Sequence, residues 1–317
     1  MSSLPDLPLL DAISSLSREK ESQDRFTAKI SRDWCTQHSV LGGYLTALIL
    51  STARKYINVD VGDEAYEPSY PDPIHVFTQF LCMVPPGQVS ISCKILRRTS
   101  RLCVVRVELD IDQGHHKPPP TPQGTSQESP ACIAIATFAD IRRENGLTQD
   151  LTASTNIHPP PHREIECVTI DDPVVDATPV TRKLHWVAPR SADGLWGHRL
   201  GGHQREVWLS FRDGSKMSDM LHLALLADLP LQPPATHAAG FYSRYALSTL
   251  CQTVEFKKRP DPKTEWVLVR SNSHRVAEGR FDVNLQILDK DGGILALSNH
   301  VVYISKLGKK LSRGARM

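Results

Sequence analysis

One aspartate in the second half of the chain stands among apolar residues. In the segment LALLADLPL, Asp228 ends a predicted helix and has leucine or alanine on almost every side. A buried carboxylate is costly unless hydrogen bonds satisfy it, and desolvation raises its pKa towards the range that suits a general base. The alternative is that Asp228 points into solvent at the helix C-terminus, where the helix dipole disfavours an anion. We expect the buried arrangement.

Two adjacent glycines open the most hydrophobic predicted helix. Gly42 and Gly43 stand in LGGYLTALIL, although glycine costs about 1 kcal/mol relative to alanine inside a helix. Their N–H groups and that of Tyr44 are among the first donors of the helix, which have no partner within it. The pair predicts a close approach of the helix start, either for tight packing alone or to a ligand oxygen.

Several common catalytic patterns are missing from the sequence. The chain has no G-x-S-x-G segment of a serine α/β-hydrolase, no G-x-G-x-x-G segment and no Walker A loop. Histidines gather in Pro-rich stretches such as GHHKPPP and HPPPH, which lack the rigid set of three or four ligands that a metal site needs. We therefore expect neither a metal nor a cofactor.

The composition is that of a folded globular chain with balanced charge. It has 317 residues, 40% of them hydrophobic, and a net charge of +2 from 37 basic and 35 acidic residues. The length fits about two domains, and the balance argues against a nucleic-acid partner. No apolar run approaches the ~20 residues of a membrane span, and the N-terminus lacks the layout of a signal peptide.

The cysteines and the C-terminus bear on the compartment. Seven cysteines without a C-x-x-C pair indicate reduced thiols inside the cell, and we expect the cytoplasm. The last three residues, Ala315–Met317, are similar to a relaxed form of the S-K-L peroxisomal address. The peroxisome is therefore the alternative.

The predicted elements occur twice in the same order. Each half has a strand, then a long helix, then several strands that alternate between apolar and polar residues. This repeat indicates an α+β protein of two copies of one unit, at residues 1–141 and 183–317, with a Pro-rich linker at 142–182.

The two helices are predicted at residues 41–56 and 214–229, with Ser215 or Ser218 as the N-cap of the second. The predicted strands lie at residues 25–34, 72–111 (several strands), 131–141, 203–211, 250–259, 265–289 (two strands) and 294–305.

Several blocks in both halves carry a family resemblance. In the first half they are GGYLTALIL, PIHVFTQFLCMVPPG and ILRRTSRLCVVRVEL. In the second half they are REVWLSFRDG, LHLALLADL, STLCQTVEFKKRP and EWVLVRSNSHRVAEGRFDVNLQILDKDGGILALSNH. Their order and spacing resemble type II (TesB-like) acyl-CoA thioesterases and the wider thioesterase-like group over nearly the whole chain. The resemblance implies a double hotdog fold, in which each unit wraps an antiparallel sheet around a long helix.

The resemblance also implies a catalytic set in the second half. In these thioesterases an aspartate, a threonine or serine, and a glutamine hold a water molecule. The aspartate corresponds to Asp228 and the hydroxyl to Thr249, with Ser248 as the alternative on the opposite strand face. The glutamine of the family pattern DG…A-x-x-x-Q corresponds to His300 in DGGILALSNH. A neutral imidazole can donate to or accept from water as an amide can, and it can also titrate near neutral pH, so the replacement leaves hydrolysis possible and adds a candidate base.

The implied activity is hydrolysis of an acyl-CoA or carrier-bound thioester. Asp228 takes a proton from the attacking water, which Thr249 and His300 orient. The developing oxyanion needs preorganised N–H donors, for which the helix start at Gly42 and Gly43, with Tyr44, is the candidate.

Three other functions stay open. A non-hydrolytic thioesterase-like protein would bind a lipophilic or polyketide-type molecule and guide isomerisation or cyclisation in a biosynthetic pathway, and His300 in place of glutamine favours it. An enoyl-CoA hydratase is disfavoured because the segment G-D-x-N-P-x-H is absent. A pure acyl-binding module is the third. The family further suggests that the chain forms a homo-oligomer.

Overall fold

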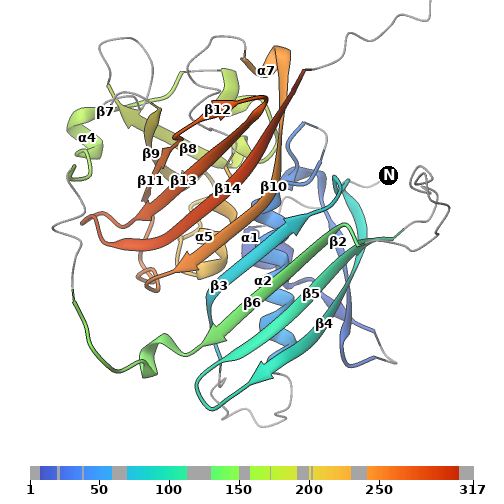
Figure 1. The fold of residues 1–317 in the computed structure, drawn as a ribbon. Helices are drawn as coiled ribbons and strands as arrows, with labels where there is room; N and C mark the ends of the chain where they lie inside the picture. The colour runs from blue at the N-terminus through green and yellow to red at the C-terminus, as the bar shows by residue number, and fades with distance from the viewer. Residues whose placement is uncertain are drawn as a thin grey trace, which may run out of the picture.

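The structure, a computed structural model, describes residues 8–19, 22–37, 39–58, 70–112, 130–149, 158–171, 173–190, 200, 203–229 and 241–306. In this part of the chain the strands form one 14-stranded sheet in which neighbouring strands run antiparallel. Figure 1 shows the sheet curving around two helices that lie side by side. The expected α+β double hotdog is therefore confirmed.

The first half of the chain supplies six of these strands. Its elements are α1 (Leu9–Ser14), β1 (Ser17–Arg18), β2 (Arg25–Ile30), η1 (Arg32–Trp34), α2 (Gly42–Ile57), β3 (Asp72–Phe80), β4 (Gly87–Arg98), β5 (Cys103–Ile111), β6 (Cys132–Ala139) and η2 (Ile141–Arg143).

The second half supplies the other strands. Its elements are α4 (Arg163–Glu166), β7 (Cys167–Thr169), η3 (Pro173–Asp176), η4 (Thr181–Lys183), β8 (Leu184–Pro189), β9 (Gln204–Phe211), α5 (Met220–Leu226), α7 (Phe241–Arg244), β10 (Tyr245–Phe256), β11 (Val267–Asn272), β12 (Val276–Ala277), β13 (Arg280–Leu288) and β14 (Ile294–Lys306).

The second central helix is shorter than the sequence predicts, and its cap is different. Neither Ser215 nor Ser218 caps α5; Asp219 does so by accepting the N–H of Leu221 at 2.8 Å. In return, Nδ1 of His222 accepts the N–H of Asp219 at 3.2 Å, which completes a capping box. The helix therefore begins at residue 220 rather than 214.

The sheet extends into the segment predicted as a linker. Within residues 142–182, β7 forms and pairs with β8 at one edge of the sheet. Strand β8 itself was not among the predicted strands. The division at 1–141, 142–182 and 183–317 stays a prediction. The tripeptide Ala315–Met317 lies outside the described residues.

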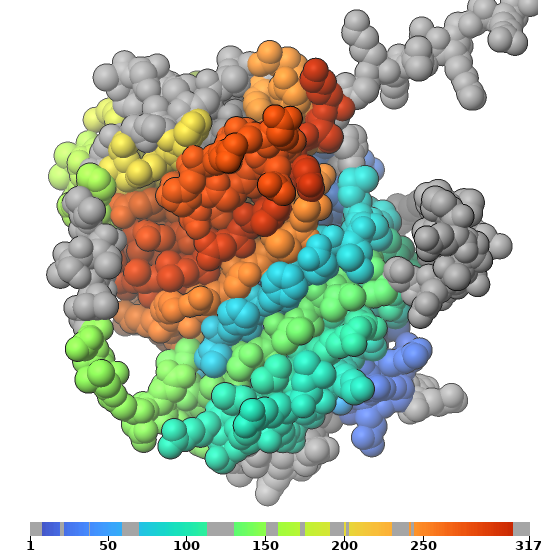
Figure 2. Space-filling model, viewed as in Figure 1, coloured from blue at the N-terminus to red at the C-terminus, as the bar shows by residue number. Residues whose placement is uncertain are grey.

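The two halves join where β3 pairs with β10. Thr78 lies opposite Gln252 and Phe77 opposite Thr253 in this antiparallel pair. Figure 2 shows cyan β3 directly beside orange β10, so that the strands of both halves make one continuous outer face. The inner face is covered by α2 and α5, which pack on each other. No helix among the described residues is long and apolar enough to span a bilayer.

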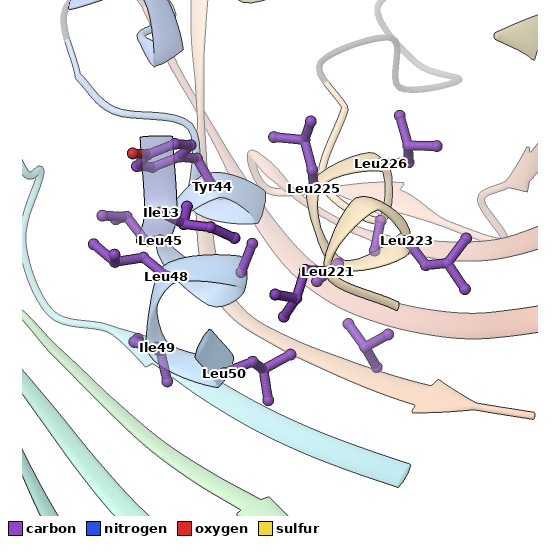
Figure 3. Packing of buried hydrophobic residues seen from close by; sticks show 14 of the residues in the cluster. Ile13, Tyr44, Leu45, Leu48, Ile49, Leu50, Leu221, Leu223, Leu225 and Leu226 are labelled. Carbon is purple, nitrogen blue, oxygen red and sulfur yellow. The ribbon is translucent and has the colours of Figure 1, made fainter. Parts of the chain in front are cut away.

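The helix pair forms the centre of the core. Figure 3 shows Leu221 of α5 on the side that faces α2, while Tyr44, Leu45 and Leu48 project from the other side of α2. Since α2 is buried along nearly its whole length, apolar side chains on several of its faces are satisfied at once. This packing brings the start of α2 close to the end of α5.

An ion pair also ties the halves together. Arg259, after β10, binds Asp72 of β3 through two hydrogen bonds of 2.7 and 2.8 Å and lies 3.8 Å from Asp140. Both carboxylates are almost fully buried. A bidentate arginine–carboxylate pair is among the stronger charged contacts in proteins.

Loss of this pair is expected to destabilise the junction. Arg259→Met should lower the free energy of unfolding by about 2 kcal/mol, because it leaves the buried Asp72 carboxylate without its counter-ion. Lys258→Met is the matched control, since its pair with Asp289 is solvent-exposed and should contribute less than about 0.5 kcal/mol. Urea unfolding measures both, and equal losses would contradict the role of Arg259.

Candidate active site

Asp228 lies where the end of α5 meets the start of α2. It follows the last turn of α5, and only 6% of the residue is exposed. Its Oδ2 accepts the backbone N–H of Gly43 at 3.0 Å, and its Oδ1 accepts the Thr249 hydroxyl at 3.2 Å. Leu41, the N-cap of α2, provides no side-chain cap, so the Asp228 carboxylate fills that place from the other helix. The positive end of the α2 dipole stabilises the anion that the end of α5 disfavours.

Burial has the largest effect on the pKa of the Asp228 carboxyl. Removal from water raises the pKa of its carboxyl from 3.8 to about 7, while hydrogen bonds from Thr249 and from the glycine N–H groups of α2 act in the opposite direction. A carboxyl with this pKa is partly ionised at neutral pH. It can therefore both take a proton and return it.

Thr249 reaches the carboxylate because β10 contains a bulge. The register between β10 and β14 shifts after Thr249, and Leu250 is the extra residue. The side chain of Gln79 on β3 donates from Nε2 to the Leu250 carbonyl at 2.9 Å and holds the bulge in place. Ser248 is exposed, so of the two neighbouring hydroxyls the structure joins Thr249 to Asp228.

His300 lies on β14 beside the same carboxylate. Its Nδ1 is 3.5 Å from Oδ1 of Asp228, and its Nε2 is 2.8 Å from the Ser298 hydroxyl. Burial lowers the pKa of His300 from 6.5 to about 4, although the backbone of Ala227 acts in the opposite direction. An imidazole that stays neutral at pH 7 and is so weakly basic contributes hydrogen bonds here rather than a second base.

The two glycines are required by space. A Cβ on Gly43 would collide with the carbonyl oxygen of Leu225 at the end of α5. A Cβ on Gly42 would lie 2.5 Å from Oδ2 of Asp228 and 2.9 Å from the Phe80 ring. Glycine therefore lets the start of α2 approach both the neighbouring helix and the carboxylate.

The predicted oxyanion donors at residues 42–44 are placed unequally. The N–H of Gly43 is bonded to Asp228, so in this arrangement it stabilises the carboxylate. The ring of Tyr44 is buried and stacks on Trp34, with ring centroids 5.2 Å apart. Figure 3 shows that this ring projects from the side of α2 turned away from α5. The oxyanion role of Gly42, Gly43 and Tyr44 stays a prediction.

Two glutamines on the strands around the site were not among the sequence candidates. Gln79 holds the bulge from the first half of the chain, and Gln252 is buried on β10 opposite His300. Identifying them requires the pairing of β3 with β10 and the bulge at Leu250, and neither is visible in the alternation of residue types. For Gln252, a polar residue at an inward position of a strand is the one signal that the sequence offers, whereas Gln79 lies on the other face of the sheet, opposite Cys251.

Comparisons with known proteins agree with this architecture. The model of the acyl-CoA thioesterase N-terminal domain matches residues 30–139, and that of the acyl-CoA thioesterase C-terminal domain matches residues 160–304. One relative, the thioesterase-like protein TwmA of Talaromyces wortmannii, is 40% identical over 57 residues. That alignment covers 18% of this chain and spans only 16% of the relative's length.

Solved structures share the fold at low sequence identity. The acyl-CoA thioesterase II TesB2 of Mycobacterium marinum aligns with a TM-score of 0.64 and 15% identity, over 95% of this chain and 98% of that one. A hot dog fold protein of Alicyclobacillus acidocaldarius aligns with a TM-score of 0.67 and 16% identity, over 95% and 100%. Because both domain models match in order along one double-hotdog chain, this protein belongs to the acyl-CoA thioesterase family.

Proposed function

We propose that the protein hydrolyses thioesters of acyl-CoA or of a carrier-bound acyl chain. The observation that carries the proposal is the buried Asp228 carboxyl, whose pKa burial raises to about 7 and which Thr249 and Gly43 hold in place. Such a group takes a proton from water at neutral pH. Membership of the thioesterase family supports the class of substrate.

In this mechanism a water molecule beside Asp228, Thr249 and His300 attacks the thioester carbonyl carbon. Asp228 takes one proton of that water while the carbonyl π electrons move onto the oxygen. The C–S bond of the tetrahedral intermediate then breaks, and the leaving thiolate takes the proton from Asp228. The products are a carboxylic acid and a free thiol, and no covalent bond to the protein forms.

The direct test is release of thiol from a panel of acyl-CoAs that runs from acetyl to palmitoyl. We expect release by the wild-type protein and its loss in Asp228→Ala. Release that survives this substitution, or no release from any member of the panel by the wild-type protein, rejects the proposal.

The hydroxyl of Thr249 is expected to set the pH at which the base works. Because its hydrogen bond lowers the pKa of Asp228, Thr249→Val should shift the rising limb of the kcat/KM profile upward from about pH 7. Activity should fall roughly tenfold at pH 6 and recover in large part at pH 9. Ser248→Ala, on the exposed face, is the control. A loss of equal size at every pH would contradict this role.

A second candidate is a non-hydrolytic activity that isomerises or cyclises a lipophilic or polyketide-like molecule. His300 at the position of the family glutamine favours it. If the site has been altered for such chemistry, His300→Gln should raise thiol release from acyl-CoA by about tenfold. An unchanged or lower rate in this variant rejects the second candidate.

A further inference from the structure

Gln252 carries a buried side-chain amide that makes no hydrogen bond to the described residues. Only 1% of the residue is exposed, and neither Nε2 nor Oε1 has a hydrogen-bond partner among the described residues. Buried amides in folded proteins almost always have partners, because an unpaired one costs free energy. A buried amide with a free donor and a free acceptor is therefore suited to bind a polar group that enters the site.

The geometry of β10 turns Gln252 towards the candidate site. Residues three apart on a regular strand point to opposite faces, but the extra residue Leu250 brings Thr249 and Gln252 onto the same face. Gln252 pairs directly with His300 on one side and with Thr78 on the other, and both are buried. Polar side chains thus follow one another across β14, β10 and β3 on the inner face of the sheet.

Several donors around Asp228 are already engaged, whereas Nδ1 of His300, 3.5 Å from Oδ1 of Asp228, has no hydrogen-bond partner among the described residues. The N–H of Gly43 and the hydroxyl of Thr249 both bind the carboxylate, and the imidazole of His300 contacts the Ser298 hydroxyl through Nε2. Asp228 can take a proton from water, but a carboxylate cannot stabilise negative charge on the substrate oxygen. A donor for that oxygen has to come from a neighbouring group, and the Gln252 amide has one to give.

We propose that Nε2 of Gln252 binds the carbonyl oxygen of the thioester and stabilises the oxyanion that forms when water attacks. This assignment rests on the proposed hydrolysis and adds a catalytic residue to it. The amide is supplied by β10, whereas the family resemblance expects a glutamine on β14, where this chain has His300. Gln252 lies next to His300 among the polar side chains that cross β14, β10 and β3. A carbonyl oxygen bound to its amide would lie beneath α2, with the acyl carbon near Asp228.

The first experiment compares Gln252→Met with wild type. Methionine has a similar volume but no donor, so kcat should fall by roughly 100-fold with little change in KM. Because the lost amide has no protein partner, the thermal midpoint should stay the same or rise. Thr253→Val, on the outer face of the same strand, is the matched control and should leave both unchanged. Wild-type kcat in Gln252→Met, or a lower thermal midpoint with a proportionate loss of kcat, overturns the inference.

The second experiment does not depend on hydrolysis. Binding is measured for two octanoyl-CoA analogues, a ketone in which CH₂ replaces the sulfur and a thioether that lacks the carbonyl oxygen. We expect Gln252→Met to weaken the ketone about tenfold and the thioether not at all. If the wild type releases no thiol but this selective weakening is found, the hydrolysis proposal fails and the contact of Gln252 with the carbonyl stands. Equal weakening of both analogues, or of neither, overturns the assignment of Gln252.

Discussion

Asp228→Asn is expected to lower kcat/KM for thioester hydrolysis by about 10²- to 10⁴-fold while the chain still folds. The amide keeps the shape of the carboxylate but cannot take a proton, so the attacking water loses its base. One of the two donors that now bind Asp228, from Thr249 and Gly43, will face an NH₂ group instead of an oxygen. The rate is therefore measured together with stability. Asp291→Asn, at an exposed carboxylate, is the control.

The same substitution should change how stability depends on pH. The folded carboxyl of Asp228 holds its proton more tightly than the unfolded one, so its contribution is complete below pH 3.8 and is lost as the pH rises through about 7. With a pKa raised from 3.8 to about 7, this loss amounts to about 4 kcal/mol. His300 acts in the opposite sense. Its folded pKa lies below 6.5, so its contribution is complete above pH 6.5 and is lost as the pH falls through about 4.

In the wild-type protein, the contribution of Asp228 to stability falls and that of His300 rises as the pH increases from 4 to 7. Asp228→Asn removes one of them, so the variant should gain stability relative to wild type as the pH rises through this window. His300→Gln removes the other and should lose stability relative to wild type over the same range. Urea unfolding at several pH values measures both differences. If the free energy of unfolding changes with pH in the same way in wild type and in Asp228→Asn, burial does not raise the pKa of the Asp228 carboxyl.

The pattern of residues was sufficient for the architecture because the core is regular. Alternation in β2, β4, β5, β6 and β13 follows burial on one face of the sheet, and the apolar run from residue 42 is a buried helix. The shorter α5 was not foreseen, because the choice among Ser215, Ser218 and Asp219 depends on which of them meets a complementary group at the third helical position. His222 provides that group for Asp219.

The candidate site was predictable only in part, because it combines groups from four separate segments. The apolar surroundings of Asp228 indicated a raised pKa, and the adjacent glycines indicated a close approach. That these two features are one contact, with the N–H of Gly43 on the Asp228 carboxylate, depends on α2 packing against α5. The sequence places these residues 185 positions apart. The bulge at Leu250 and the buried amide of Gln252 follow from strand pairing between the halves, which local patterns do not specify.

Gly43→Ala is expected to cause a large loss of stability, although alanine is the better helix former. By propensity alone the change would stabilise α2 by about 1 kcal/mol. The added Cβ, however, meets the carbonyl oxygens of Leu225 and Ala224, which belong to the backbone of α5 and cannot rotate away. The helices must separate, and overpacking of this kind costs about 3 kcal/mol. Ser51→Ala, a half-buried position on the same helix, is the control and should change stability by less than about 0.5 kcal/mol.

Substitution of the neighbouring glycine, Gly42, separates the effect on helix packing from the effect on catalysis. A Cβ on Gly42 meets only the ends of two side chains, the carboxylate of Asp228 and the ring of Phe80, and both can move. Gly42→Ala should therefore cost little stability but displace the base, with a loss of roughly 100-fold in kcat/KM. Gly43→Ala should lower both stability and kcat/KM, since separation of the helices also stretches the 3.0 Å hydrogen bond between the N–H of Gly43 and Asp228. Thermal unfolding and thiol release are measured on both variants. If Gly42→Ala keeps wild-type kcat/KM, the Asp228 carboxylate is a structural cap of α2 and not the base of the reaction.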